Sequence, residues 1–286
     1  MFDGFERRQI AASGATINLV MRGQGPPVLL LHGYPQTHAI WHLVAPRLAR
    51  DFTVVAPDLR GYGDSSKPPG GADHSGYGKR AMAFDQVEVM QALGFQCFAV
   101  VGHDRGARVA YRLALDHPDR VTHLALLDIV PTHTVFAAVD RAVATHTFHW
   151  FFLIQPEPLP ERLIGNDPEF FLRTLLARWS GNGLASFAPE ALAEYVRCFK
   201  DPAVDYRAGA TVDCDADSSD YGRRRIGCPT LTLWGSRGRL EQRKPLDVWR
   251  EWASDVRGRG IDSGHFLPEE APDETSAALL ELLCRD

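Results

Sequence analysis

The sequence predicts an α/β fold with a doubly wound, mainly parallel sheet and helices on both faces. Continuous apolar runs such as residues 27–31 are typical of strands buried on both faces of such a sheet. Helical patterns separate these runs, and this alternation favours parallel strands. A chain of 286 residues, 45% hydrophobic, suits one large domain with an insertion or two small domains.

The predicted elements follow one another at regular spacing. A two-stranded hairpin is expected over residues 6–22, split by Ser13 and Gly14. Buried strands are expected at residues 27–31, 52–56, 98–101, 121–127, 228–234 and 256–261. Helices are expected from Trp41 to about Arg50, over residues 76–94, directly after Gly106, and over residues 272–283.

The alternation of strands and helices stops between residues 131 and 225. This stretch is rich in aromatic side chains and has the pattern of several short helices. A structureless loop of that length is uncommon in a compact domain. We therefore predict a helical cap, residues 131–225, inserted after the sixth strand of a core formed by residues 1–130 and 226–286.

Composition restricts the kind of partner. Lys and Arg number 31 against 36 Asp and Glu, and the net charge of −5 offers no general attraction to nucleic acid or an acidic membrane. The five cysteines are scattered without C-x-x-C spacing, which predicts reduced thiols and neither disulfides nor a zinc site. With no signal-peptide or membrane-helix pattern, we expect a cytoplasmic protein that binds a small molecule and needs no metal or cofactor.

The sequence Gly102-His103-Asp104-Arg105-Gly106 lies between a predicted strand and a predicted helix. Its two glycines have the spacing of a nucleophile elbow, which raises one side chain above the edge of a sheet. Here that side chain is an aspartate, which can attack a saturated carbon and form an alkyl ester. The alternative is an ordinary turn aspartate.

Two further residues complete a predicted triad. Asp128 follows the next strand and His265 lies in a late loop, so the chain order is nucleophile, acid, histidine. His265 would take a proton from water while Asp128 holds its tautomer. Asp128 could instead be a helix N-cap. His32 and His103 are expected to brace the loops beside the nucleophile.

Backbone donors and arginines are expected around Asp104. The turn His32-Gly33-Tyr34-Pro35 ends a neighbouring strand, so the N–H groups of Tyr34 and Arg105 would form an oxyanion hole, unless the turn has no catalytic role. Arg105 and Arg108 are one helical turn apart and suit a substrate carboxylate. Alternatively, they pair with acids at the sheet edge.

Five motifs together resemble the haloacetate dehalogenases of the α/β-hydrolase fold, the fluoroacetate dehalogenases in particular. The motifs are His32-Gly33-Tyr34-Pro35-Gln36-Thr37-His38, Gly102-His103-Asp104-Arg105-Gly106-Ala107-Arg108, Asp128-Ile129-Val130-Pro131-Thr132, His149-Trp150-Phe151-Phe152, and Gly264-His265-Phe266-Leu267-Pro268-Glu269-Glu270. The resemblance implies an eight-stranded-type sheet, and attack by Asp104 on the α-carbon of a haloacetate. It also implies ester hydrolysis by water activated by His265, with glycolate as product.

The same resemblance implies that His149, Trp150 and a cap tyrosine, Tyr206, hold the departing halide. By spacing alone, His149 and Trp150 are core aromatics of a cap helix. Residues 201–205 lead directly into Tyr206, where relatives carry a short extra segment. Dimers are usual in families of this kind, which implies a homodimer.

Two other functions stay open at this level. An epoxide hydrolase would share the aspartate, the histidine and His-Gly-x-Pro, and would need two cap tyrosines among Tyr195, Tyr206 and Tyr221. The arginine pair and His149-Trp150 disfavour it. A non-catalytic binding protein on the same fold is disfavoured because nucleophile, acid and base are all present.

Overall fold

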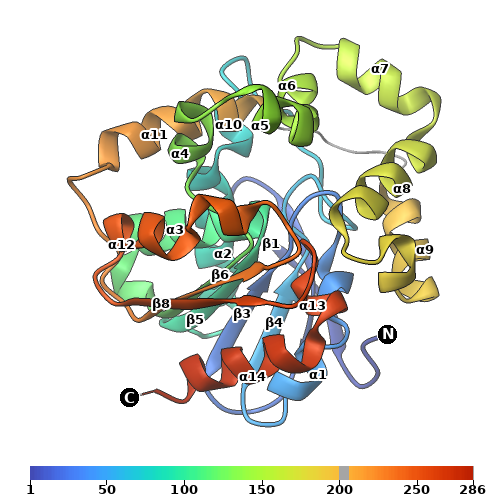
Figure 1. Ribbon diagram of the computed structural model, residues 1–286. Helices are drawn as coiled ribbons and strands as arrows, with labels where there is room; N and C mark the ends of the chain where they lie inside the picture. The colour runs from blue at the N-terminus through green and yellow to red at the C-terminus, as the bar shows by residue number, and fades with distance from the viewer. Residues whose placement is uncertain (200–205, 286) are drawn as a thin grey trace.

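The computed structural model describes residues 1–199 and 206–285. Its centre is an eight-stranded sheet with the order β1-β2-β4-β3-β5-β6-β7-β8 (Figure 1). The strands are β1 (Glu6–Ala11), β2 (Thr16–Arg22), β3 (Pro27–Leu31), β4 (Thr53–Pro57), β5 (Phe98–His103), β6 (Val121–Leu127), β7 (Thr230–Gly235) and β8 (Val256–Ile261). The predicted eight-stranded, mainly parallel sheet is confirmed.

Strand direction follows from the connections. The short turn between β1 and β2 gives an antiparallel hairpin, and β2 also pairs antiparallel with β4. All other pairs, from β4 through β3 and β5 to β8, are parallel. The carboxyl ends of these parallel strands therefore lie along one edge, where side chains from loops far apart in sequence meet.

Alternating side chains on the strands build two cores. On β3, Val28 and Leu30 face one side, and Leu29 and Leu31 face the other; all four are fully buried. Helices α1 (Ala45–Leu48) and α14 (Pro272–Leu283) cover the first face. Helices α2 (Lys79–Ala92), α3 (Arg105–Asp116) and α12 (Pro245–Trp252) cover the second (Figure 1).

The helices that come between β6 and β7 in the sequence lie above the carboxyl edge of the sheet (Figure 1). The described helices here are α4 (Thr132–Ala137), α5 (Arg141–His146), α6 (Phe148–Leu153), α7 (Leu159–Asn166), α8 (Pro168–Trp179), α9 (Pro189–Phe199), α10 (Arg207–Ala210) and α11 (Val212–Asp220). Helices α4, α6, α7, α8 and α9 contribute to a third apolar core. We keep the division into a core, residues 1–130 and 226–286, and a cap, residues 131–225, as a proposal.

Three predicted boundaries were wrong in detail. The helix expected up to Arg50 is instead a 3-10 turn (His38–Trp41) and the separate α1, because Pro46 lacks the N–H that a continuing helix needs. Likewise, β7 begins after Pro229, which has no donor for the ladder. The helix expected over residues 76–94 begins later, at Lys79, after a 3-10 turn (Ser75–Tyr77).

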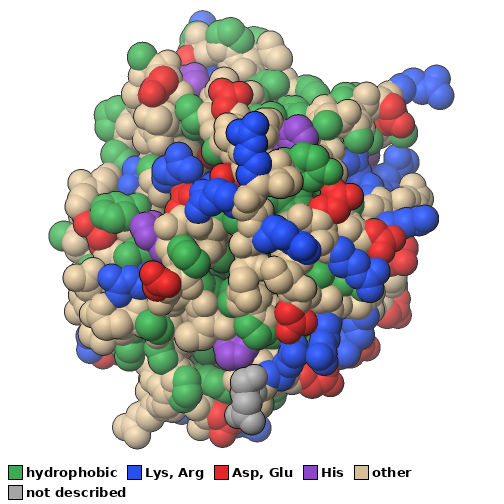
Figure 2. All heavy atoms as spheres, turned by 90° about the vertical axis from the view of Figure 1, so that its left-hand side faces the viewer, with side chains coloured by type: hydrophobic (Ala, Val, Ile, Leu, Met, Phe, Trp, Pro, Cys, Tyr) green, Lys and Arg blue, Asp and Glu red, His purple; other side chains and the backbone are tan. Residues whose placement is uncertain are grey.

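The surface over α11 and α12 carries positive and negative side chains close together (Figure 2). This face therefore presents no broad area of one charge, as the modest net charge suggests. No helix in the described part of the chain combines the length and apolar character needed to cross a membrane.

Leu279 on α14 tests the importance of the core under the sheet. Its side chain is fully buried, so Leu279→Ala should lower the free energy of unfolding by about 2–5 kcal/mol in urea titration. Leu163, which is 58% exposed, is the matched control. Leu163→Ala should change the free energy of unfolding by less than about 0.5 kcal/mol. Equal losses in the two variants would contradict this description of the core.

Candidate active site

Asp104 lies in the sharp turn between β5 and α3. Its backbone has φ 49° and ψ −118°, a conformation that L-residues rarely adopt. The following glycine makes this turn feasible, since a Cβ on Gly106 would lie 2.3 Å from the carbonyl oxygen of His32. The turn thus has the geometry of a nucleophile elbow.

The two carboxylate oxygens of Asp104 face different partners. Oδ1 accepts a hydrogen bond of 2.9 Å from the backbone N–H of Tyr34, and Oδ2 lies 3.8 Å from Nε2 of His265. Burial opposes the charge, but the positive charges of His265, Arg108 and Arg105 outweigh it and lower the pKa of Asp104. The carboxylate is therefore ionised at neutral pH.

His265 and Asp128 form a tight pair beside Asp104. Nδ1 of His265 lies 2.5 Å from Oδ2 of Asp128, whose other oxygen accepts from the N–H of Gly235 at 2.9 Å. Burial works against protonation of His265, but the hydrogen bond and charge of Asp128, with the charge of Asp104, raise the pKa of His265. The imidazole is thus oriented with Nε2 toward Asp104 and is suited to hold a proton.

The two histidines expected to brace the neighbouring loops do so. His103 donates from Nε2 to the carbonyl oxygen of His265 at 2.7 Å, and His32 accepts from the N–H of Leu59 at 3.0 Å. Burial lowers the pKa of His103 to about 3 and that of His32 to about 4. Both are neutral and hold loop backbone in place.

A cavity of about 730 Å³ opens onto these groups. Six of the predicted site residues line it: Asp104, Arg108, Asp128, His149, Trp150 and His265. The remaining three, Tyr34, Arg105 and Tyr206, are not part of this wall. Arg105 and Tyr206 lie next to it. The guanidinium carbon of Arg105 is 4.1 Å from the centre of the Tyr206 ring, and the centres of the Tyr206 and His149 rings are 5.7 Å apart.

Aromatic residues from core and cap meet above Asp104. The Tyr206 ring lies 6.0 Å from that of Trp150 and 5.1 Å from that of Tyr34. Burial lowers the pKa of His149 to about 3, so its ring is neutral, and its Nδ1 has no partner in the described structure. The residues preceding Tyr206, 200–205, lie outside the described residues, and so does the shortened segment expected there.

Arg108 presents a free nitrogen in a buried position. Its Nη1 donates to the carbonyl oxygen of Val130 at 3.1 Å and to Oγ1 of Thr132 at 2.9 Å, and its guanidinium lies 4.7 Å from the Trp150 ring. Its Nε is buried without a partner. Arg108 forms no ion pair with an acid in the described residues, so the expected alternative of acid pairing fails for it there.

Only one of the three candidate cap tyrosines lies beside Asp104 in the described structure. Tyr195 is fully buried and donates to Oε1 of Glu269 at 2.9 Å. Tyr221 is exposed and donates to Oε2 of Glu251 at 2.7 Å. Tyr206 contacts the rings of Tyr34 and His149, which lie above Asp104.

The described residues contain no group of three or more His, Cys, Asp or Glu side chains placed to hold a metal ion. Instead, His265 pairs with Asp128 and lies 3.8 Å from Asp104.

Comparison with known proteins agrees with this geometry. The family model of the alpha/beta hydrolase fold matches residues 26–272. The chain belongs to the alpha/beta hydrolase fold family. A crystal structure from Nostoc sp. PCC 7120, provisionally described as an alpha/beta hydrolase, superposes with a TM-score of 0.98 at 55% identity and covers 100% of both chains.

Several relatives within the alpha/beta hydrolase family have assigned activities. Fluoroacetate dehalogenase from Burkholderia sp. is 48% identical over 99% of this chain and 95% of its own length. Soluble epoxide hydrolase from Corynebacterium sp. strain C12 is 36% identical over 92% of each. A Pseudomonas aeruginosa structure with bound MFA is provisionally described as an epoxide hydrolase mutant. It is 49% identical, the match covers 99% of this chain and 97% of that one, and the TM-score is 0.93.

Glu269 is a site neighbour whose contacts the sequence did not indicate. It follows His265 by one helical turn, is buried, and accepts from Tyr195 of α9 and from Nε2 of Gln36 at 2.6 Å. Burial raises the pKa of Glu269 to about 8. A carboxyl group that is protonated at neutral pH thus joins the cap to the turn that carries Tyr34.

Glu269 should make folding stability depend on pH. The folded state keeps the Glu269 proton up to about pH 8, whereas the unfolded chain loses it near 4.5, so the free energy of unfolding should fall as pH rises through this window. In Glu269→Gln this part of the slope should vanish, since the amide can donate to Tyr195 and accept from Gln36. Urea titrations from pH 5 to 8 check this, and parallel slopes for wild type and variant would contradict it.

Proposed function

We propose that this protein hydrolyses the carbon–halogen bond of haloacetates, fluoroacetate and chloroacetate, to give glycolate and halide through an aspartyl ester. The observation that carries the proposal is the ionised Asp104 in one cavity wall with the unpaired Nε of Arg108 and the His265–Asp128 pair. The 48% identity to a fluoroacetate dehalogenase supports the same substrate.

The first step is attack by Asp104 on the α-carbon of the haloacetate. Oδ2 is the attacking atom, because Oδ1 is already bound by the Tyr34 N–H and Oδ2 faces the cavity and His265. The new C–O bond forms as the carbon–halogen bond breaks, and the electron pair leaves with the halide. Because Asp104 is ionised, this step needs no general base.

The halide leaves toward the neutral aromatic donors of the cap. We assign its stabilisation to N–H groups of His149 and Trp150 and to the hydroxyl of Tyr206. Fluoride is small and strongly hydrated, so donors fixed before the reaction must replace its water. The neutral state of His149 suits this role, since its ring can donate without adding a full charge.

The second step hydrolyses the ester. His265 takes a proton from water, and the resulting hydroxide attacks Cγ of Asp104. Negative charge then develops on Oδ1, which the Tyr34 N–H already contacts, and we assign the second donor to the Arg105 N–H. The tetrahedral species collapses, and the proton held on His265 passes to the glycolate oxygen. The carboxyl group left on Asp104 still carries the second proton of the water, and its loss to solvent restores the Asp104 carboxylate.

Arg105 and Arg108 are proposed to hold the substrate carboxylate. Arg108 lines the cavity with an unsatisfied donor, and both arginines are among the charges that lower the pKa of Asp104. Two positive charges also offset the repulsion between an anionic nucleophile and an anionic substrate. The small halogenated acid is thus the proposed partner; a homodimer and a cytoplasmic location stay predictions.

The epoxide hydrolase alternative finds less support. Epoxide opening by this kind of site was expected to use two cap tyrosines, yet Tyr195 and Tyr221 donate to Glu269 and Glu251. The wall of the cavity offers Arg108 where a neutral epoxide needs no cation. The relationship to the Corynebacterium enzyme, at 36% identity, is also weaker than that to the dehalogenase.

Halide release by the purified protein tests the proposal. Fluoroacetate and chloroacetate are incubated separately, and free fluoride, free chloride and glycolate are measured. In each incubation, the amount of halide released should equal the amount of glycolate formed. Release of chloride alone would remove fluoroacetate from the substrate class. If neither halide is released, the proposed function is overturned.

Asp104→Asn should abolish halide release. The amide cannot form the ester, and loss of a nucleophile of this type costs on the order of 10⁴-fold or more in kcat. Acetate should still bind, because both arginines remain. Turnover at the wild-type rate would contradict the nucleophile assignment.

Arg108→Lys should weaken the use of haloacetates. Lysine keeps the charge but loses the planar fork and its bond to Thr132, so KM should rise about 10- to 100-fold. Arg7→Lys, on the exposed edge strand β1, is the matched control and should leave KM unchanged. Steady-state chloride release gives both values, and an unaltered KM in Arg108→Lys would remove Arg108 from the carboxylate site.

A further inference from the structure

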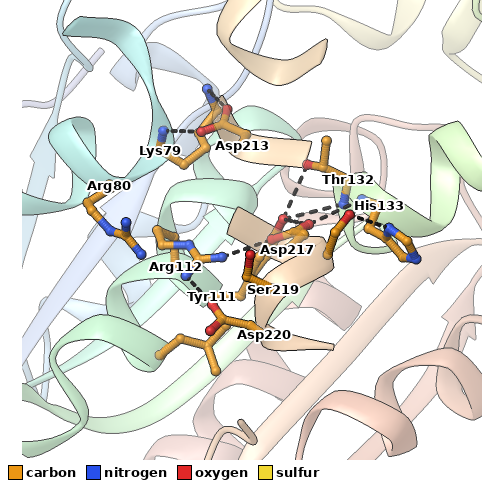
Figure 3. Close-up of polar contacts among 12 residues, drawn as sticks. Lys79, Arg80, Tyr111, Arg112, Thr132, His133, Asp213, Asp217, Ser219 and Asp220 are labelled. Carbon is orange, nitrogen blue, oxygen red and sulfur yellow. Dashed lines mark hydrogen bonds and ion pairs between the residues drawn. The ribbon is translucent and has the colours of Figure 1, made fainter. Parts of the chain in front are cut away.

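Arg108 is connected to the cap by a row of hydroxyl groups. Its Nη1 lies 2.9 Å from Oγ1 of Thr132, which lies 3.2 Å from the hydroxyl of Tyr111. The Tyr111 hydroxyl donates to Oδ2 of Asp217 at 2.7 Å (Figure 3). Thr132 begins α4, Tyr111 lies on α3, and Asp217 lies on α11, so three helices meet in this row.

The donors in this row all point the same way. A guanidinium can only donate, and a carboxylate can only accept. Burial and the charge of Asp217 raise the pKa of Tyr111 far above its usual value, so its hydroxyl keeps the proton that it donates to Asp217. The Thr132 hydroxyl must therefore donate to Tyr111 while it accepts from Arg108. Each bond in such a row polarises the next.

Asp217 is itself fixed by a buried ion pair. Its Oδ1 accepts from Nη2 of Arg112 at 2.9 Å, and Nη1 of Arg112 binds Asp220 at 2.6 Å. Asp213, one turn earlier, pairs with Lys79 at 3.2 Å (Figure 3). Asp213, Asp217 and Asp220 lie at helical spacing on one face of α11, which attaches this helix to α2 and α3.

The same contacts fix the start of α4. The backbone N–H of Thr132 donates to the Tyr111 hydroxyl at 3.3 Å, and that of His133 donates to Asp217 at 3.2 Å. Val130, whose carbonyl oxygen also binds Arg108, directly precedes this turn. The Arg108 fork is thus held by Val130, which lines the cavity, and by the row of Thr132, Tyr111 and Asp217, which does not.

We propose that Thr132, Tyr111 and Asp217 are positioning residues that aim the Arg108 guanidinium at the substrate carboxylate. The inference rests on the proposed function only in placing a carboxylate at Arg108. Their removal should weaken carboxylate binding and leave the attacking groups, Asp104 and His265, in place.

The test measures the dissociation constant of acetate, used as a carboxylate probe that carries no halogen, in the wild type and in matched variants. Tyr111→Phe and Thr132→Val should each weaken acetate binding about tenfold, the effect of one hydrogen bond to a charged group. Thr132→Ser retains the hydroxyl and should stay within about threefold of the wild type.

Tyr77→Phe is the control for loss of a buried tyrosine hydroxyl. Tyr77 is 5% exposed and its hydroxyl donates to the carbonyl oxygen of Pro68 at 2.8 Å, away from Arg108. Tyr77→Phe should leave acetate binding unchanged, even if the melting temperature of this variant falls as much as that of Tyr111→Phe. With chloroacetate, Tyr111→Phe should raise KM about tenfold and change kcat less than about threefold.

Unaltered acetate binding in Tyr111→Phe, or equal weakening in Tyr77→Phe, would overturn the positioning role. A wild type that binds no acetate would overturn it as well, because the carboxylate site would be absent. If acetate binding follows the expected pattern and no haloacetate releases halide, the positioning role stands and the proposed function fails.

Discussion

The left-handed backbone of Asp104 at the end of β5 is the constraint on which the site depends. This turn sets the carboxylate above the sheet edge and lets α3 begin at once, so Arg105 and Arg108 follow Asp104 closely. The neighbouring strand β3 ends beside it, which brings the Tyr34 N–H onto Oδ1. A relaxed turn would move the Asp104 carboxylate away from the Tyr34 N–H.

Charge is balanced within the buried site. Two carboxylates, Asp104 and Asp128, lie on either side of His265, and the arginines of α3 add positive charge. The two neighbouring histidines with strongly lowered pKa values, His103 and His149, stay neutral because burial dominates there. The environment therefore separates one histidine that can hold a proton from others that serve as fixed neutral groups.

Two buried carboxyl groups join the cap helices to the core on opposite sides of the nucleophile elbow. Glu269 connects Tyr195 of α9 to Gln36, and Asp217 of α11 connects to Tyr111 and Arg112 of α3. Their chemistry differs, since burial favours the neutral acid at Glu269 while Asp217 is paired with an arginine. In both cases a buried polar contact fixes one relative position of the parts that enclose the cavity.

The sequence by itself determined the mainly parallel sheet, the alternation of its strands with helices and the identity of the elbow aspartate. Apolar runs and glycine spacing are local signals, which is why these features could be predicted. It also indicated Asp128 and His265 through chain order, and the structure brings both to Asp104. Only the tertiary structure decided which cap tyrosine lies near Asp104 and which atoms hold Arg108. Tyr206 follows Asp104 by about a hundred positions, as Asp217 follows Tyr111, and no local pattern encodes such a pairing.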